Sequence, residues 1–101
     1  MLLKIEEARY LGNHRFILRF NDGRSGTVDL RPLADEEPKA AFAQLADEVF
    51  VSRFRLEHGT LSWPGDLDVA PEYLYFLAFR DDPALHDRFA AWGYLKETAH
   101  A

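Results

Sequence analysis

The sequence contains no cysteine, and this absence removes several kinds of site at once. Without thiols the chain has no disulfide framework, no thiolate zinc site and no cysteine nucleophile. Such a composition fits a reducing compartment, so we expect a cytoplasmic protein.

Long apolar runs are also absent. The longest run, residues 73–79, is far shorter than the roughly 20 residues that span a bilayer. Residues 1–7 lack the basic start and the apolar stretch of a signal peptide. We therefore expect neither membrane insertion nor secretion.

Basic residues are fewer than acidic ones: the chain has 12 Lys and Arg residues and 17 Asp and Glu residues, which gives a net charge of -5. This imbalance repels nucleic acid at long range, so only a local basic patch would favour such a partner. Hydrophobic residues make up 48% and charged residues 29% of the 101 residues, which is typical of a globular chain and not of a disordered one. We predict a single domain over residues 1–101.

The recognisable motifs of catalysis and metal binding are missing too. No two of the histidines are spaced to share a helix face, so we expect surface side chains and no metal ligands. They are His14, His58, His86 and His100. No serine lies in a nucleophile elbow, and Gly23 and Gly26 belong to a predicted hairpin, where they do not lead into a helix as a phosphate loop does. The sequence therefore predicts no enzyme, no cofactor and no metal site.

What the first half does contain is an alternating pattern typical of a β-meander. Residues 15–20 alternate cleanly between apolar and charged side chains. The apolar parity changes within residues 3–10, which predicts a strand with a bulge, followed by a turn at Gly12-Asn13. The segment Asn21-Asp22-Gly23 tolerates positive φ and should close a hairpin onto residues 26–30.

The middle of the chain changes its periodicity. A polar loop is expected at residues 35–39, and apolar residues at three- and four-residue spacing predict a short amphipathic helix over residues 38–50. Residues 53–57 and 60–63 then alternate again, with Leu56 facing inward, and predict a second hairpin.

Two further helices complete the predicted fold. Pro71 suits the first turn of a helix that reaches about Arg80, and Asp82-Pro83 supplies the N-cap and first position of the last helix. That helix places Trp92 on its apolar face and ends at Gly93. The predicted fold class is α+β: a small antiparallel sheet, made of the β-meander and the second hairpin, packed against about three helices.

Three carboxylates form an acidic cluster beside aromatic residues. Asp66, Asp68 and Glu72 could hold a cation or act as a general acid and base. Alternatively, Asp68 accepts backbone amides at the start of the helix at Pro71, and this capping role is the favoured interpretation.

Arginines gather on the outward positions of the predicted strands. The usual explanation is a solvated face with weak cross-strand ion pairs, and a patch for RNA or an acidic partner is the alternative. The face is expected to hold Lys4, Arg15, Arg19, Arg53 and Arg55 together with Glu6, Asp29 and Glu57.

Residues 73–79 have no polar side except for phenolic hydroxyls, so both sides of the predicted helix need cover. The sheet and the last helix can provide it, which is the favoured interpretation because the last helix has an apolar stripe of its own. Alternatively, one side is a dimer or partner interface.

Two groups of residues carry a family resemblance. The first is the strand of residues 15–20, which leads into Asn-Asp-Gly and ends at Pro32-Leu33. The second joins residues 59–65, which include Trp-Pro-Gly, to Asp-Val-Ala-Pro-Glu-Tyr at residues 68–73. Together they resemble the short bacterial domains catalogued as domain of unknown function 2442. The resemblance covers about residues 3–75, and residues 80–101 form a C-terminal helical extension.

The resemblance implies an α+β fold and little chemistry, because the family has no established enzymatic activity. Some members look like partners of small toxin-like proteins, and some are fused to helix-turn-helix segments, of which this sequence has no convincing example. The matching positions could form a shared surface or could only maintain the fold. They are Trp63, Pro64, Asp68, Pro71, Glu72 and Tyr75.

The sequence thus favours a non-catalytic protein-interaction or regulatory module, an antitoxin-like partner in a bacterial two-protein system. Its partner would be a co-encoded small protein or a second copy of the chain. The expected interaction surface comprises Trp63, Pro64, Asp66, Asp68, Glu72, Tyr73, Tyr75, Phe76 and Phe79. The alternative is a nucleic-acid-binding accessory domain. Its contacts would come from Arg15, Arg19, Arg53 and Arg55.

Overall fold

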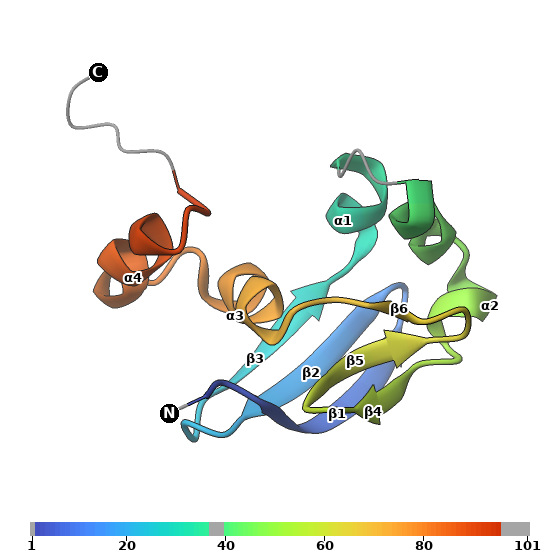
Figure 1. Cartoon of the computed structure of the whole chain (residues 1–101), viewed down its shortest axis with the longest axis horizontal. Coiled ribbons are helices and arrows are strands. Elements are labelled where there is room, and N and C mark those ends of the chain that lie inside the picture. Colours follow the sequence, from blue (N-terminus) through green and yellow to red (C-terminus); the bar gives the residue numbers. More distant parts are fainter. Residues whose placement is uncertain (1, 37–39, 96–101) are drawn as a thin grey trace.

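A computed structural model describes residues 2–36 and 40–95 of the chain. The described residues form six strands, four α-helices and two 3-10 helices, arranged as two three-stranded antiparallel sheets with helices packed against them (Figure 1). The predicted α+β class is confirmed. His100 and the start of the predicted helix over 38–50 lie outside the described residues.

The first sheet is the predicted meander of β1 (Ile5–Gly12), β2 (Arg15–Phe20) and β3 (Ser25–Asp29). Every second residue of β2 is fully buried, as the alternation predicted. The register between β1 and β2 shifts between Ile5 and Glu7, which is the predicted bulge.

Both turns of the meander use residues in the left-handed region. Asn13 and His14 have φ of 54° and 66°, and Gly23 has φ of 89°. The Phe20 amide donates to the Arg24 carbonyl at 2.9 Å and closes the second hairpin. The two predicted turns are therefore confirmed.

A second sheet, and not an extension of the first, holds the other hairpin. It contains β4 (Arg55–Glu57), β5 (Thr60–Trp63) and β6 (Leu67–Asp68). The sequence did not predict β6, because two residues are too few to show alternation. Leu56 is 38% exposed, so its predicted inward orientation is wrong: β4 is a short edge strand with all its residues exposed. β1 lies beside β4 and β5, and the Ile5 amide donates to the Gly59 carbonyl at 2.8 Å.

The segment between the two sheets differs from the prediction. The helix α1 (Arg31–Glu36) begins directly after β3 and includes the start of the predicted polar loop. Its start is favoured because Asp29 Oδ1 accepts the Arg31 amide at 2.9 Å and because Pro32 suits a first helical turn. The helix predicted over 38–50 is two pieces, η1 (Ala40–Ala46) and α2 (Glu48–Val51). Asp47 separates them because its side chain caps α2 by accepting the Val49 amide.

The helix α3 (Pro71–Phe79) begins and ends as predicted. After it, Asp82 accepts the Ala84 amide as the predicted cap, but the first turn is the 3-10 helix η2 (Pro83–Leu85), which continues as α4 (His86–Ala91). Gly93 has φ of 87° just beyond the helix, as expected at its carboxyl end. Trp92 is only partly covered, with 37% of it exposed.

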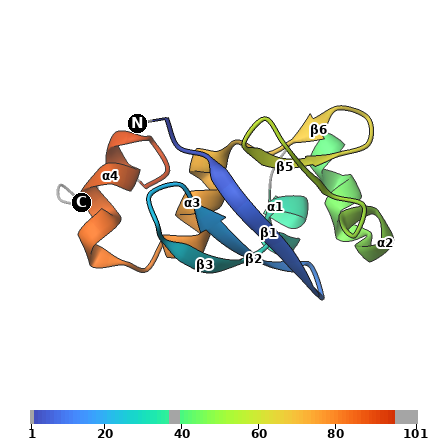
Figure 2. The same cartoon turned by 90° about the horizontal axis from the view of Figure 1, so that it is seen from below.

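The layers run from strands to α3 to α4 in both views (Figures 1 and 2). Tyr75 on α3 contacts Phe20 of the first sheet on one side, with ring centroids 5.0 Å apart, and Phe76 contacts Phe89 of α4 on the other, at 5.1 Å. The favoured prediction of intramolecular cover for residues 73–79 is confirmed at these positions. Of the described helices, none has the length and apolar character that crossing a membrane requires.

Candidate binding groove

The predicted interaction surface divides into buried and accessible residues. Trp63, Tyr75 and Phe76 are buried, so they are core residues in this structure. The Trp63 indole donates to the Val51 carbonyl at 3.0 Å and joins β5 to α2. Phe79 is half-buried against Phe20, at 5.9 Å between ring centroids. These four residues maintain the fold and are not available as a continuous surface.

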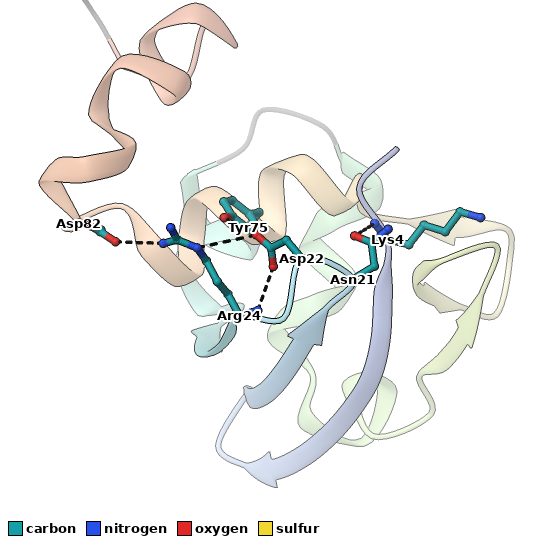
Figure 3. A network of polar contacts seen from close by, with 6 residues as sticks. All are labelled: Lys4, Asn21, Asp22, Arg24, Tyr75 and Asp82. Carbon is teal, nitrogen blue, oxygen red and sulfur yellow. Dashed lines mark hydrogen bonds and ion pairs between the residues drawn. The ribbon is translucent and has the colours of Figure 1, made fainter. Parts of the chain in front are cut away.

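The ring of Tyr75 packs in the core, but its hydroxyl takes part in a polar network (Figure 3). Its hydroxyl donates to Asp22 Oδ2 at 2.7 Å, and Asp22 Oδ1 accepts the Arg24 amide at 2.9 Å. The Arg24 guanidinium lies 3.8 Å from Asp22 and 3.3 Å from Asp82. The network therefore joins the β2–β3 turn to α3 and to the cap of η2.

The network shifts two pKa values in opposite directions. Burial raises the pKa of Asp22, but the hydrogen bonds from the Arg24 amide and the Tyr75 hydroxyl, together with the Arg24 charge, outweigh it, and the net pKa lies below the usual value. Burial and the neighbouring Asp22 carboxylate raise the pKa of Tyr75. At neutral pH Asp22 is therefore a carboxylate that accepts a hydrogen bond from the neutral phenol of Tyr75.

A groove of about 400 Å³ lies where five parts of the chain meet. Leu33 comes from α1, Phe42 from η1, Tyr73 from α3, and Tyr94 follows α4. The end of β6 and the two residues that join it to α3 complete the described lining with Asp68, Val69 and Ala70. The walls are therefore mainly aromatic and aliphatic, with one carboxylate at the surface.

The side chain of Asp68 is exposed to solvent and does not cap α3. The residue at the N-cap position is Ala70, and no side chain caps the helix there. The favoured prediction for Asp68 is therefore wrong: Asp68 ends β6, paired across to Ser62, and its side chain is exposed. Of the predicted surface, Asp68 and Tyr73 line the groove, whereas Pro64 and Asp66 lie in the exposed β5–β6 turn and do not.

The rings of the groove pack against one another. Tyr73 and Tyr94 meet edge to face with centroids 5.3 Å apart, and Phe76 supports Tyr94 at 5.2 Å. Burial raises the pKa of Tyr94, and the negative charge of Glu72 raises it further. Glu72 thus acts on Tyr94 through its charge, although it is not part of the described lining of the groove.

The family model described as Protein of unknown function (DUF2442) matches residues 5–80. The chain belongs to the DUF2442 family. No curated protein and no solved structure matches the chain.

The DUF2442 match ends with α3, and this divides the groove. Leu33, Phe42, Asp68 and Tyr73 lie within the matched residues, whereas Tyr94 lies in the segment that follows them. The C-terminal segment of this DUF2442 chain thus adds one wall to a groove whose other walls come from the family domain.

The four arginines of the alternative face do not lie on one sheet. Arg15 and Arg19 belong to β2 in the first sheet, whereas Arg55 belongs to β4 in the second and Arg53 precedes that strand. Arg19 Nη2 lies 2.9 Å from Glu7 Oε1, so part of its charge is compensated. The grouping expected from a single sheet is therefore wrong, because the second hairpin forms its own sheet.

A polar cluster around the β1–β2 turn was missed by the sequence reasoning. His14 is buried, contrary to its predicted surface position, and its Nε2 donates to the Ala46 carbonyl at 2.8 Å. Nε2 must carry the proton because a carbonyl only accepts, so Nδ1 accepts from Arg31 Nη2 at 3.3 Å. Glu48 Oε1 accepts the Asn13 amide at 2.7 Å, and this bond chiefly lowers the pKa of Glu48.

The signal for this cluster was weak, since His14 and its partners come from segments far apart in the sequence. Only the turn at Gly12-Asn13 pointed to this place. These hydrogen bonds hold the β1–β2 turn against α1, η1 and α2, so the role of the cluster is to stabilise the fold. Among the described residues, no three His, Asp or Glu side chains come close enough together to hold a metal ion.

Proposed function

We propose that this DUF2442 chain is a protein-interaction module that binds a segment of a partner protein in the groove. The observation that carries the proposal is the groove itself, whose walls come from five separate parts of the chain and include partly exposed aromatic residues. Tyrosine and phenylalanine are enriched at protein interfaces because they bury a large area at little entropic cost. A cavity of about 400 Å³ suits one or two side chains of an inserted segment.

The partner class that we propose is a small co-encoded protein, with this chain as the regulatory, antitoxin-like component of a bacterial two-protein system. The support is the family resemblance and the unpaired groove carboxylate, which can select a partner by charge. A binding role needs no catalytic group, and the groove contains no nucleophile beside a base in its described lining.

Affinity capture from the native host tests the proposal. Ala70→Arg fills the groove from its rim without disturbing the core, since Ala70 is exposed and its extended backbone before Pro71 accepts an arginine. Ala84→Arg, at another exposed alanine, is the matched control. We expect wild type and Ala84→Arg to retain the same stoichiometric partner and Ala70→Arg to lose it.

Two results would contradict the proposal. One is that wild type retains no stoichiometric partner. The other is that Ala70→Arg retains the partner as well as wild type does, with all three proteins equally folded by circular dichroism. The open reading frame next to the gene supplies the first candidate partner for reconstitution with purified proteins.

A further inference from the structure

We propose that two copies of the chain pair through the outer edge of β3, so that β1, β2 and β3 of both copies form one continuous antiparallel sheet. The first sheet has the order β1-β2-β3, and β3 lies at its rim (Figure 2). The opposite edge, β1, has two register shifts, and its Ile5 amide donates to the Gly59 carbonyl of the β4–β5 turn. The pairing of β2 with β3 has no shift, so β3 presents a regular edge.

The hydrogen bonds between β2 and β3 show which backbone groups of β3 face outward. At one end of the ladder the Phe20 amide donates to the Arg24 carbonyl at 2.9 Å. At the other end the Leu30 amide donates to the His14 carbonyl at 2.9 Å. Because hydrogen-bonded pairs alternate in an antiparallel ladder, the even-numbered residues of β3 bond to β2 and the odd-numbered residues point away from it. Within residues 2–36 and 40–95, the amides and carbonyls of these outward residues have no hydrogen-bond partner. The outward residues are Ser25, Thr27 and Asp29.

The helix α3 covers the inner face of β3 and not its edge. It approaches the strand at Gly26, where an added Cβ would lie 2.9 Å from Phe79 Cε1. A Cβ stands out of the plane of a sheet, whereas the backbone amides and carbonyls point along the sheet to the neighbouring strand. Natural edge strands are commonly protected from pairing by lysine, proline or a bulge. None of these occurs in β3, whose sequence is Ser-Gly-Thr-Val-Asp.

The pattern of β3 fits a second copy of itself. With Thr27 on the two-fold axis, Thr27 faces Thr27 of the second copy and Ser25 faces its Asp29, so every outward residue joins a hydrogen-bonded pair. Each pair exchanges two bonds, which gives roughly six hydrogen bonds between the chains. The Ser25 hydroxyl can also donate to the facing Asp29 carboxylate. With Asp29 on the axis instead, a single pair would form, and it would place like charges opposite each other.

Sedimentation equilibrium of the full-length protein over a range of concentrations tests the inference, and we expect a monomer–dimer equilibrium for wild type. Thr27→Pro removes the central outward amide without removing a bond to β2, and Thr27→Lys places two like charges on the axis. Each should raise the dimer dissociation constant at least about tenfold. Val49→Lys is the matched control, because it adds the same charge at an exposed residue of α2, and it should leave the constant unchanged.

A single cysteine provides a second measurement that does not depend on the proline variant folding, since the chain has no other thiol. In the proposed pairing the two Cα atoms at position 27 lie about 5.5 Å apart. A short bismaleimide should therefore join two Thr27→Cys chains and leave Val49→Cys chains single.

Three results would each overturn the inference: a monomer at every concentration, a dimer that both Thr27→Pro and Thr27→Lys leave intact, or equal cross-linking of the two cysteine variants. The described lining of the groove contains no residue of β3, so this contact and the groove partner fail separately. A dimer that is lost with Ala70→Arg and retained by the Thr27 variants would assign the contact between copies to the groove and remove the β3 pairing.

Discussion

At the scale of single residues, Asp22 shows how one side chain can serve both a turn and a distant helix. The sequence predicted Asn21-Asp22-Gly23 as a turn because these residue types tolerate its backbone. The structure adds that the same carboxylate accepts the Tyr75 hydroxyl, 53 residues away. No local pattern could reveal that contact, since the turn would form equally well without Tyr75.

Asp22 should make stability depend on pH. Its pKa is lower in the folded than in the unfolded chain, so its contribution is complete above the unfolded value and is lost as pH falls through the folded value. We expect Asp22→Asn to lower the free energy of unfolding by about 1–3 kcal/mol at pH 6, the usual effect of a hydrogen bond to a charged group. Urea denaturation from pH 6 to pH 2.5 should show this difference shrinking.

The exposed Asp66 provides the comparison for this experiment, and Asp66→Asn should leave the free energy of unfolding nearly unchanged at every pH. A constant difference between wild type and Asp22→Asn across the range would show that the charge of Asp22 is not what stabilises the turn.

At the scale of elements, prediction succeeded where the signal was local. The alternation of residues 15–20 and the proline at position 71 fixed β2 and the start of α3. Prediction failed over residues 38–50, because the apolar spacing continued through Asp47 although this residue caps a new helix. The capping prediction for Asp68 was wrong for a related reason. An aspartate suits an N-cap, but the chain at Asp68 is still extended in β6.

The contact between α3 and β3 depends on a residue without a side chain. A Cβ added to Gly26 would lie 2.9 Å from Phe79 Cε1 and 3.1 Å from Ala78 Cβ, so an alanine there must displace the helix or the ring. We expect Gly26→Ala to lower the free energy of unfolding by about 1–3 kcal/mol, as overpacking does. Chemical denaturation measures it, with Ser25→Ala on the same strand as the control.

The opposite outcome is informative as well. Replacing glycine by alanine in an extended strand with free space usually stabilises a protein by restricting the unfolded chain. A Gly26→Ala protein at least as stable as wild type would therefore mean that α3 does not pack against β3 as closely as described.

At the scale of the whole molecule, the groove is the feature that the sequence could not assemble. Asp68 and Tyr73 were expected on a shared surface, but Leu33, Phe42 and Tyr94 come from three other parts of the chain. Their convergence is a property of long-range packing, in which α4 covers α3 and thereby brings Tyr94 to Tyr73. Long-range packing also buries Trp63, Tyr75 and Phe76, which the sequence predicted as part of an interaction surface.

The whole fold also separates the two candidate surfaces. The outer face of the first sheet carries Arg15 and Arg19, whereas the inner face supports α3 and, beyond it, the groove. A partner bound at one surface would leave the other accessible to solvent. A method that locates the binding site along the chain can therefore distinguish them.

Amide hydrogen exchange of the protein, alone and with its captured partner, tests the central claim most directly. If the partner binds in the groove, the exchange of amides in residues 67–77 should slow on binding, and the exchange in β1 and β2 should stay unchanged. Slower exchange confined to β1 and β2, with residues 67–77 unaffected, would contradict the claim and assign the interaction to the outer face of the sheet.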